Sequence, residues 1–335
     1  MNGSQIDPAA LPIGVVGLGL MGCSIATCLL IAGHPVVAVA PLPADVPTAL
    51  PRIHDHLRKA REEQLITGAP DNYLSQLLIT ENYDELNACR VVIECTLENI
   101  AIKRDVYARI EVVVADDALI TSNTSAIPIS LLQREVRLPA RFLGLHWAEP
   151  SHVTRFLEII CGDLTDVSQG EWLYQLAQHW NKEPTLVRRD IRGFITNRIN
   201  YAMYREAFSL VENGYATIED VDRACRNNTG WWIMLTGIFR WMDLTGVSAY
   251  HTVMKDLLPT LTNQTDVPKL IDDIVKAGGN GVSNAQGFYD YTPEEAALWK
   301  ETYEDFSYDI RRLAQKYPAD VVKKKLARLH ENEPD

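Results

Sequence analysis

The sequence of 335 residues predicts a two-part α/β protein, with a doubly wound parallel sheet followed by an all-helical C-terminal domain. Over the first half, short apolar runs alternate with helical stretches, which is typical of parallel strands joined by crossover helices. A glycine-rich turn follows the first apolar run. From Gly193 onward the pattern changes to long amphipathic stretches such as residues 201–213, which favours a separate helical domain.

Six short apolar runs are the predicted strands, since strands buried on both faces of a parallel sheet read as continuous apolar segments. An insertion at about residues 47–78 is predicted to form two helices that make a charged arm. Thr217 and Asp220 are spaced as in a shortened capping box, which marks the start of a helix in the second domain. The predicted strands are 14–16, 36–39, 91–94, 119–121, 142–145 and 157–160.

A polar stretch at residues 188–192 is the predicted domain boundary. It gives a sheet domain over residues 1–189 and a helical domain over residues 190–325. The charged tail at residues 326–335 is expected to fray.

Charge and cysteine content restrict the class of partner. A formal net charge of -12 disfavours nucleic acid and anionic membrane surfaces as partners. The six cysteines contain no C-x-x-C pair and no zinc-type spacing, so we expect free thiols in a cytoplasmic protein and no metal site. Residues 1–12 lack a signal-peptide pattern, and no run of 18 apolar residues predicts a membrane span.

The glycine-rich turn has the strand, turn and helix context that a dinucleotide-binding motif requires. Gly17 permits the tight turn, Gly19 lets the backbone approach a pyrophosphate, and Gly22 allows the helix to pack on the strand. Leu20 and Met21 begin the helix whose N–H groups donate to the phosphates. We therefore expect a Rossmann-type domain that binds a dinucleotide.

The acidic residue that normally binds the ribose hydroxyls is missing after the second predicted strand, where Ala40 is followed by Pro41. Without that carboxylate the sequence loses both an attraction to NAD and a repulsion of the 2′-phosphate of NADP. We expect NAD, held by other contacts, with NADP not excluded. Asp45 is a candidate substitute, and Arg52 is a candidate partner for a 2′-phosphate.

Four further segments follow the glycine motif in a specific order and spacing. Together they resemble the L-3-hydroxyacyl-CoA dehydrogenase family, including its 3-hydroxybutyryl-CoA members. The resemblance extends from Ile13 to about Tyr291 and is far more specific than the glycines alone. The segments are Val92-Ile93-Glu94-Cys95-Thr96-Leu97-Glu98-Asn99 with Lys103, Ser122-Asn123-Thr124-Ser125, His146 with Glu158, and Asp190-Ile191-Arg192-Gly193-Phe194-Ile195-Thr196-Asn197-Arg198.

The resemblance implies reversible hydride transfer at a secondary alcohol, with His146 as acid/base and Glu158 orienting it. An imidazole suits this role because it titrates near neutrality, and a carboxylate on its other nitrogen fixes the tautomer. The implied substrate is a short 3-hydroxyacyl-CoA, and the helical domain would form a homodimer. The other implied site residues are Ser125 and Asn197 on the substrate, and Glu98, Lys103 and Asn123 on the cofactor side.

Two departures from the family pattern bear on specificity. Glu149 stands where the family usually has an asparagine after the catalytic histidine, so a potential anion is the leading candidate for altered specificity. Tryptophans replace a proline-rich turn in the helical domain. We interpret Trp231, Trp232 and Trp241 as core or dimer interface, with a cage for a cationic substrate as the alternative.

The basic face of the predicted arm has two interpretations. Arg52 and Lys59 could receive the phosphates of CoA, as the resemblance implies, or the face could simply be solvated. Two rival functions also stay open at this point. One is a dehydrogenase of a free hydroxy acid, such as a sugar acid or a carnitine-like molecule, and the other is a non-catalytic dinucleotide-binding protein.

Overall fold

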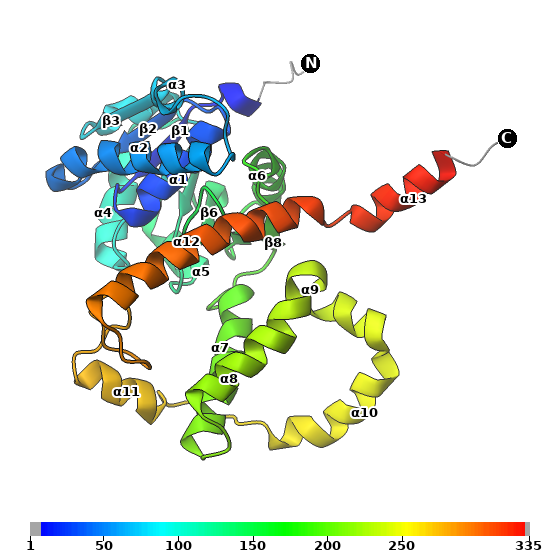
Figure 1. The fold of residues 1–335 in the computed structure, drawn as a ribbon. Coiled ribbons are helices and arrows are strands. Elements are labelled where there is room, and N and C mark those ends of the chain that lie inside the picture. The colour runs from blue at the N-terminus through cyan, green and yellow to red at the C-terminus, as the bar shows by residue number, and fades with distance from the viewer. Residues whose placement is uncertain (1–7, 332–335) are drawn as a thin grey trace. The chain divides into compact units, whose positions relative to one another are not determined.

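The computed structural model describes residues 8–331 of the chain (Figure 1). It divides into two compact units, one ending at Arg198 and the other beginning at Ile199. This division lies just beyond the polar stretch 188–192. The turn after Gly193 belongs to the first unit because the backbone N–H groups of Ile195 and Thr196 donate to Glu158 of the sheet.

The first unit contains an eight-stranded sheet in the order β3-β2-β1-β4-β5-β6-β7-β8. All neighbouring strands are parallel except β6 and β7. The predicted doubly wound α/β fold is confirmed, and its chain reversal lies between β1 and β4. The strands are β1 Ile13–Val16, β2 Val36–Val39, β3 Leu77–Thr80, β4 Val91–Glu94, β5 Leu119–Ser122, β6 Phe142–Trp147, β7 Leu157–Cys161 and β8 Thr185–Val187.

Two strands and one strand direction were not predicted. The strands β3 and β8 form the two edges of the sheet, where exposed positions such as Leu78 and Thr185 interrupt the continuous apolar pattern of a buried strand. The strand β7 is antiparallel because residues 148–156, which connect it to β6, contain no crossover helix. The antiparallel pairing places the end of β6 opposite the beginning of β7.

Helices cover both faces of this sheet, and each face has its own apolar core. One core joins α1 and α6 to residues such as Val15 and Leu145, and the other joins α4 to residues such as Val16 and Ile120. The helices of this unit are α1 Leu20–Ile31, α2 Val46–Glu62, α3 Pro70–Leu74, α4 Ile100–Glu111, α5 Ile129–Leu132 and α6 Val167–His179, with single 3₁₀ segments at Pro8–Ala10, Pro43–Asp45, Tyr83–Ala88, Gln133–Glu135 and Pro139–Arg141.

The predicted arm is part of this packed unit. Ala49, Ile53, Leu57 and Ala60 are fully buried along one face of α2, at the spacing of an amphipathic helix packed on a core. The second predicted helix is the short α3, and the last residues of the stretch 47–78 already belong to strand β3. The prediction of two helices as an arm is thus corrected to α2, α3 and the beginning of an edge strand.

The second unit is all-helical, as predicted. Thr217 caps α8, since its side chain accepts a hydrogen bond from the Asp220 backbone N–H. The π-helical segment Cys225–Thr229 joins α8 to α9. The helices are α7 Thr196–Glu212, which begins in the first unit, α8 Ile218–Ala224, α9 Gly230–Thr245, α10 Val247–Leu257, α11 Lys269–Lys276, α12 Pro293–Lys316 and α13 Val321–Glu331, with a 3₁₀ turn at Leu258–Thr260.

The charged tail forms α13 as far as Glu331, so the expectation that it frays is wrong for its described part. Lys324 pairs with Asp320 four residues earlier at 3.1 Å, an arrangement that supports a helix. Residues 332–335 lie outside the described range. Within residues 8–331 no helix combines the length and the apolar character needed to cross a bilayer.

Candidate active site

The antiparallel pairing of β6 and β7 places His146 directly opposite Glu158. The Nδ1 atom of His146 lies 2.9 Å from Oε2 of Glu158, and both side chains are buried. Strand β6 runs to Trp147, so His146 lies within the strand and not just after it as predicted. The structure therefore brings together the two residues predicted as acid/base and orienting carboxylate.

The ionised carboxylate of Glu158 accepts hydrogen bonds at both of its oxygens. Its Oε1 accepts hydrogen bonds from the backbone N–H groups of Ile195 and Thr196, at 3.1 and 2.9 Å, and from the Thr196 hydroxyl. Burial raises the pKa of Glu158, but the hydrogen bonds from His146 and Thr196 outweigh it and hold the pKa below its ordinary value. The carboxylate therefore accepts from Nδ1–H of His146, which leaves Nε2 to exchange a proton with substrate.

Two phenylalanines flank the His146 ring, and neither of them was predicted as a site residue. The ring centroid of Phe156 lies 5.4 Å from that of His146, and the centroid of Phe194 lies 5.6 Å from it. Phe194 is fully buried with a left-handed φ of 52° and follows Gly193, whose φ is 80°. Such backbone strain costs about 1–3 kcal/mol, so surrounding contacts hold this turn beneath the imidazole.

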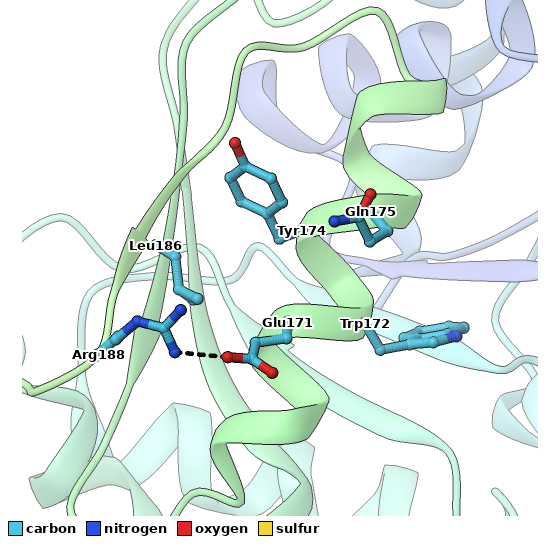
Figure 2. Close-up of a pocket in the computed structure, with 6 residues that line it drawn as sticks. All are labelled: Glu171, Trp172, Tyr174, Gln175, Leu186 and Arg188. Atoms are coloured by element: carbon cyan, nitrogen blue, oxygen red, sulfur yellow. Dashed lines mark hydrogen bonds and ion pairs between the residues drawn. The ribbon is translucent and has the colours of Figure 1, made fainter.

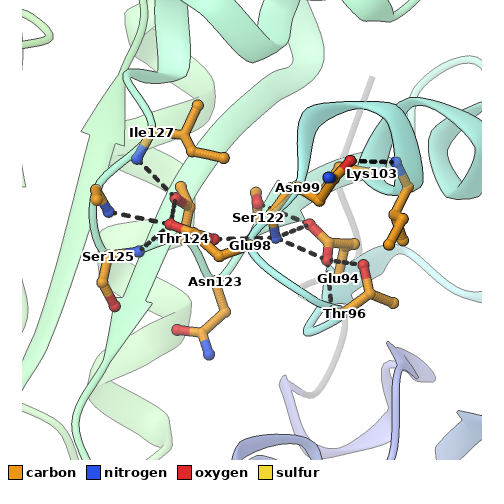
Figure 3. A network of polar contacts seen from close by, with 12 residues as sticks. Glu94, Thr96, Glu98, Asn99, Lys103, Ser122, Asn123, Thr124, Ser125 and Ile127 are labelled. Atoms are coloured by element: carbon orange, nitrogen blue, oxygen red, sulfur yellow. Dashed lines mark hydrogen bonds and ion pairs between the residues drawn. The ribbon is translucent and has the colours of Figure 1, made fainter. Parts of the chain in front are cut away.

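The backbone of Ser125 is fixed from two sides while its side chain is exposed (Figure 3). Its N–H donates to Glu98 Oε1 at 3.2 Å, and its carbonyl oxygen accepts from Asn197 Nδ2 at 2.8 Å. The structure thus brings together the predicted residues Ser125, Asn197 and Glu98. It leaves the Ser125 hydroxyl available to a substrate.

Lys103 and Asn123 have partners within the protein. Lys103 is fully buried, with its Nζ 2.9 Å from Glu94 Oε1 and 3.5 Å from Glu98 Oε2, so it presents no exposed surface to a cofactor in this structure. Asn123 accepts a hydrogen bond from the Trp147 backbone N–H at 3.1 Å, which ties the end of β5 to the end of β6. Glu94 was not predicted as a site residue, although its place at the end of β4 within a matched segment was a usable signal.

The glycine turn meets the requirements of a dinucleotide phosphate. A Cβ atom at Gly17, where φ is +103°, would lie 2.8 Å from the Cys95 carbonyl oxygen, and one at Gly22 would lie 1.8 Å from the Gly17 carbonyl oxygen. A Cβ at Gly19 would meet nothing within 4 Å. Open space at Gly19 beside the start of α1, where Leu20 is 58% exposed, fits the close approach of a pyrophosphate.

These differences predict opposite outcomes for two alanine substitutions. We expect Gly22→Ala to destabilise the protein by about 1–3 kcal/mol, since the turn has to shift to accept the methyl group. We expect Gly19→Ala to keep the wild-type Tm but to raise the Kd for NADH about tenfold or more, because its methyl group occupies the space of the phosphate. Thermal unfolding and NADH fluorescence titration measure both. Equal NADH affinity in Gly19→Ala and wild type would contradict this placement of the phosphate.

Arg52 lies at the glycine turn and not on an exposed arm. Its Nη1 atom lies 3.4 Å from the Leu18 carbonyl oxygen and 3.7 Å from Cys23 Sγ. Burial raises the pKa of the Cys23 thiol, Arg52 opposes this, and the charges of Asp45 and Glu149 add to it. Of the predicted specificity residues, Arg52 thus contacts the glycine turn and the first turn of α1.

The rest of the basic face on α2 is largely neutralised or solvated. Arg58 forms ion pairs of 2.6 Å with Asp55 and with Glu62 on the same helix. Lys59 is half-buried on the same helix. His56 stacks on His152 with ring centroids 4.6 Å apart. No cluster of three or more metal-ligating side chains occurs within the described residues.

Trp231, Trp232 and Trp241 all lie on α9, which has no fully buried residue. The indole of Trp231 is 83% exposed, so the core interpretation is wrong for this residue. The rings of Trp232 and Trp241 are stacked with centroids 5.1 Å apart and an interplanar angle of 5°. Rings stacked in this way leave no space between their faces for a cation, so this pair does not support the cage interpretation.

A surface hollow lies between α6 and β8, and none of its lining residues was predicted as a site residue (Figure 2). Arg188 crosses it and forms an ion pair with Glu171 at 2.7 Å. Neither His146 nor Glu158 lines this hollow, so it is separate from the candidate active site. Its lining residues are Glu171, Trp172, Tyr174, Gln175, Leu186 and Arg188.

Comparison with known protein families matches both parts of the chain. Residues 12–191 match the model described as 3-hydroxyacyl-CoA dehydrogenase, NAD binding domain. Residues 193–291 match the model described as 3-hydroxyacyl-CoA dehydrogenase, C-terminal domain. The two matches cover most of the chain and follow one another in the order expected for that family.

Two curated relatives differ in the substrate that their names give. The 5-formyl-3-hydroxy-2-methylpyridine 4-carboxylate 5-dehydrogenase of Mesorhizobium japonicum is 32% identical over 286 residues, covering 84% of this chain and 91% of the relative. The 3-hydroxybutyryl-CoA dehydrogenase of Mycobacterium tuberculosis is 30% identical over 282 residues, covering 83% of this chain and 98% of the relative.

Solved structures show the same two substrate types. The crystal structure of 5-formyl-3-hydroxy-2-methylpyridine 4-carboxylic acid 5-dehydrogenase, described as an NAD⁺-dependent dismutase, superposes with a TM-score of 0.84 at 29% identity, covering 91% of this chain and 99% of that one. The structure of (S)-3-hydroxybutyryl-CoA dehydrogenase from Ralstonia eutropha superposes with a TM-score of 0.71 at 27% identity, covering 84% and 99%.

Proposed function

Because the chain belongs to the 3-hydroxyacyl-CoA dehydrogenase family and is an NAD-dependent oxidoreductase, we propose that it reversibly oxidises the 3-hydroxyl group of a short 3-hydroxyacyl-CoA. The observation that carries this proposal is the buried pair of His146 and Glu158, joined at 2.9 Å. Ser125 and Asn197, which are hydrogen-bonded to each other, supply the substrate-positioning groups. Such a substrate would assign the enzyme to fatty acid metabolism.

In the proposed mechanism, His146 accepts the proton of the substrate hydroxyl at Nε2 and returns it in the reverse direction. Glu158 fixes the Nδ1–H tautomer and stabilises the imidazolium that forms. The Ser125 hydroxyl and the Asn197 amide orient the reacting oxygen. The rings of Phe156 and Phe194 restrict water around the imidazole. Bound NAD supplies the acceptor of the hydride.

The cofactor would be held by the glycine turn and by groups that compensate for Ala40. Gly17, Gly19 and Gly22, with Leu20 and Met21 at the start of α1, would receive the pyrophosphate. Ala40 itself is buried, so its side chain has no role toward a ribose. Asp45, directly before α2, is our candidate for the missing acid.

Arg52 would serve the cofactor phosphates and not those of CoA. Its guanidinium contacts the Leu18 carbonyl oxygen within the glycine turn, and an arginine is suited to bind phosphate oxygens at two points. Lys59 then remains the candidate for a CoA phosphate on α2. An Arg52 contact with a 2′-phosphate would allow NADP as a weaker alternative to NAD.

A second candidate function is the oxidation of a free hydroxy acid or a related compound without CoA. The solved structure that superposes with a TM-score of 0.84 is described as a dehydrogenase of a pyridine carboxylic acid, a compound without CoA. Glu149 also departs from the family asparagine, and one of its carboxylate oxygens is buried. A carboxylate at this position would repel an anionic acyl group and could bond the hydroxyl or ammonium group of a carnitine-like substrate.

A substrate panel decides between these functions. We expect NADH formation with 3-hydroxybutyryl-CoA to exceed that with free 3-hydroxybutyrate, carnitine and a pyridine alcohol carboxylate. Activity on free acids alone would overturn the CoA proposal, and saturable NADH binding without any turnover would favour a non-catalytic protein. We expect Glu149→Asn to lower the kcat/KM ratio of CoA ester to free 3-hydroxybutyrate about tenfold, because the repulsion between Glu149 and the carboxylate of the free acid is removed. An unchanged ratio would remove Glu149 from the specificity residues.

We also propose that the chain forms a homodimer through its helical unit and resides in the cytoplasm. Large apolar side chains such as Trp231, Phe239 and Leu244 are exposed on α9, which supports an interface there. Sedimentation equilibrium should give twice the chain mass, and Trp231→Lys should shift it toward the monomer. The six free cysteines support a reducing compartment.

A further inference from the structure

Glu94 is fully buried at the end of β4, next to the chain reversal of the sheet. Its Oε1 accepts hydrogen bonds from the backbone N–H and the hydroxyl of Thr96, both at 2.6 Å. Its Oε2 accepts from Ser122 Oγ at 2.7 Å and from Tyr107 OH at 3.0 Å. One carboxylate therefore joins the ends of β4 and β5 to helix α4.

Lys103 connects this carboxylate to the site (Figure 3). Its Nζ lies 2.9 and 3.0 Å from the two oxygens of Glu94, and neither side chain is exposed. The same Nζ lies 3.5 Å from Glu98 Oε2. Glu94 and Lys103 form a fully buried ion pair, so removing Lys103 alone would leave the Glu94 carboxylate as an uncompensated buried charge.

Glu98 completes the connection to the substrate turn. Its Oε1 accepts hydrogen bonds from the backbone N–H groups of Ser125 and Ala126, both at 3.2 Å, and from the Thr124 hydroxyl. Burial raises the pKa of Glu98, but the Thr124 hydrogen bond and the Lys103 charge outweigh it, so the pKa is lowered. Glu98 is therefore an ionised acceptor for the turn that carries the Ser125 hydroxyl.

We propose that Glu94 is a positioning residue of this enzyme, which holds Lys103 so that Glu98 fixes the backbone of Ser125. Asn197 holds the same residue from the other side through the Ser125 carbonyl oxygen. In this arrangement Glu98 and Lys103 also act on the substrate turn, through the backbone of Ser125. The inference rests on the proposed substrate contact of Ser125, whereas the backbone restraint can be measured without it.

Two variants remove the connection with different risks to folding. Lys103→Met leaves Glu94 with its Thr96, Tyr107 and Ser122 donors. The double variant Glu94→Gln with Lys103→Met removes both charges and keeps the side-chain volumes, so it carries the test where the single variant fails to fold. Arg104→Met is the matched control, since Arg104 is the next residue of α4 and forms only an exposed ion pair with Asp105.

Kinetics distinguish positioning from cofactor binding. We expect both variants to lower kcat and kcat/KM about tenfold or more, with the Kd for NADH within about twofold of wild type. In a Ser125→Ala background the same changes should cost less than about twofold further, because the group they position is gone. Arg104→Met should leave all three constants unchanged. The proposal would be overturned if the losses of kcat caused by Ser125→Ala and by the Lys103 variants simply multiplied. It would also be overturned if the Lys103 variants lost NADH affinity at unchanged kcat.

Hydrogen exchange tests the restraint even if no tested substrate is turned over. We expect peptides spanning residues 120–130 to exchange faster in both variants than in wild type, through the freed amides of Ser125 and Ala126. Ser125→Ala should leave exchange in residues 94–103 unchanged. If residues 120–130 of the double variant exchanged their amide hydrogens at the wild-type rate, the proposal would be overturned. Faster exchange in a protein that turns over no tested substrate would count against the proposed function alone.

Discussion

Replacing His146 with glutamine is expected to lower kcat by about a thousandfold while the fold and the affinity for NADH are retained. Positioned acid/base groups contribute about 10²–10⁴-fold, and a glutamine amide cannot accept and return a proton near neutrality. Glutamine can still donate to Glu158 Oε2, which holds Nδ1 of His146 at 2.9 Å in the wild type. The loss should therefore appear in kcat and kcat/KM equally, since the proton is transferred only in the chemical step.

The matched control for this substitution is His34→Gln. His34 is a fully buried histidine of the same unit, with Nδ1 bonded to the Leu11 carbonyl oxygen and Nε2 accepting from Trp180 Nε1. It lies outside the proposed site, so its replacement should lower Tm but leave kcat unchanged. Stopped-flow measurement of NADH formation and NADH fluorescence titration test both variants. A kcat for His146→Gln within tenfold of wild type would exclude His146 as the acid/base.

The central strands of the sheet were predictable and its edges were not. Strands β1 and β4 are buried on both faces, so residues 13–16 and 91–93 read as unbroken apolar runs. An edge strand such as β3 has one side exposed, and its pattern resembles a loop or a helix end. The antiparallel direction of β7 follows from the short connection at residues 148–156, so the spacing of the two predicted strands was a usable signal for it.

The candidate site was predictable in its residue types but not in its connections. The family resemblance identified His146, Glu158, Ser125 and Asn197, and the structure brings them together as two hydrogen-bonded pairs. The roles of Glu94 and Phe194 depend on contacts between elements distant in sequence, since Glu94 bonds Ser122 across 28 positions. Such contacts follow from sheet order and register, which local pattern does not determine.

Replacing Glu158 with glutamine is expected to lower kcat for alcohol oxidation by about a hundredfold. The ionised carboxylate fixes the proton on Nδ1 of His146, so Nε2 is the free base. A glutamine whose Oε1 still accepts from the Ile195 and Thr196 N–H groups would turn its amide N–H toward Nδ1. The imidazole would then carry its proton on Nε2 and could not accept the substrate proton. The imidazolium formed in the reaction would also lose its counter-charge.

The same substitution has a stability effect whose dependence on pH has a definite sign. The pKa of Glu158 is lower in the folded protein than in the unfolded chain, so its stabilisation is complete above the ordinary pKa of a glutamate. That stabilisation is lost as the pH falls through the lowered value. Glu158→Gln should therefore be less stable than wild type at pH 7, by about 2 kcal/mol, and the difference should shrink below about pH 4.

Glu111→Gln is the matched control that separates this stability effect from catalysis. Glu111 is a nearly buried carboxylate that accepts from the backbone N–H groups of Arg137 and Leu138, as Glu158 does from Ile195 and Thr196, but it lies outside the proposed site. We expect it to lower Tm at pH 7 like Glu158→Gln while kcat stays at the wild-type value. If Glu158→Gln retained wild-type kcat with a lowered Tm, the carboxylate would be a structural partner of His146 and the tautomer argument would fail. A loss of kcat that persists at every pH where both variants are folded would instead assign the loss to the imidazole, because unfolding cannot account for it.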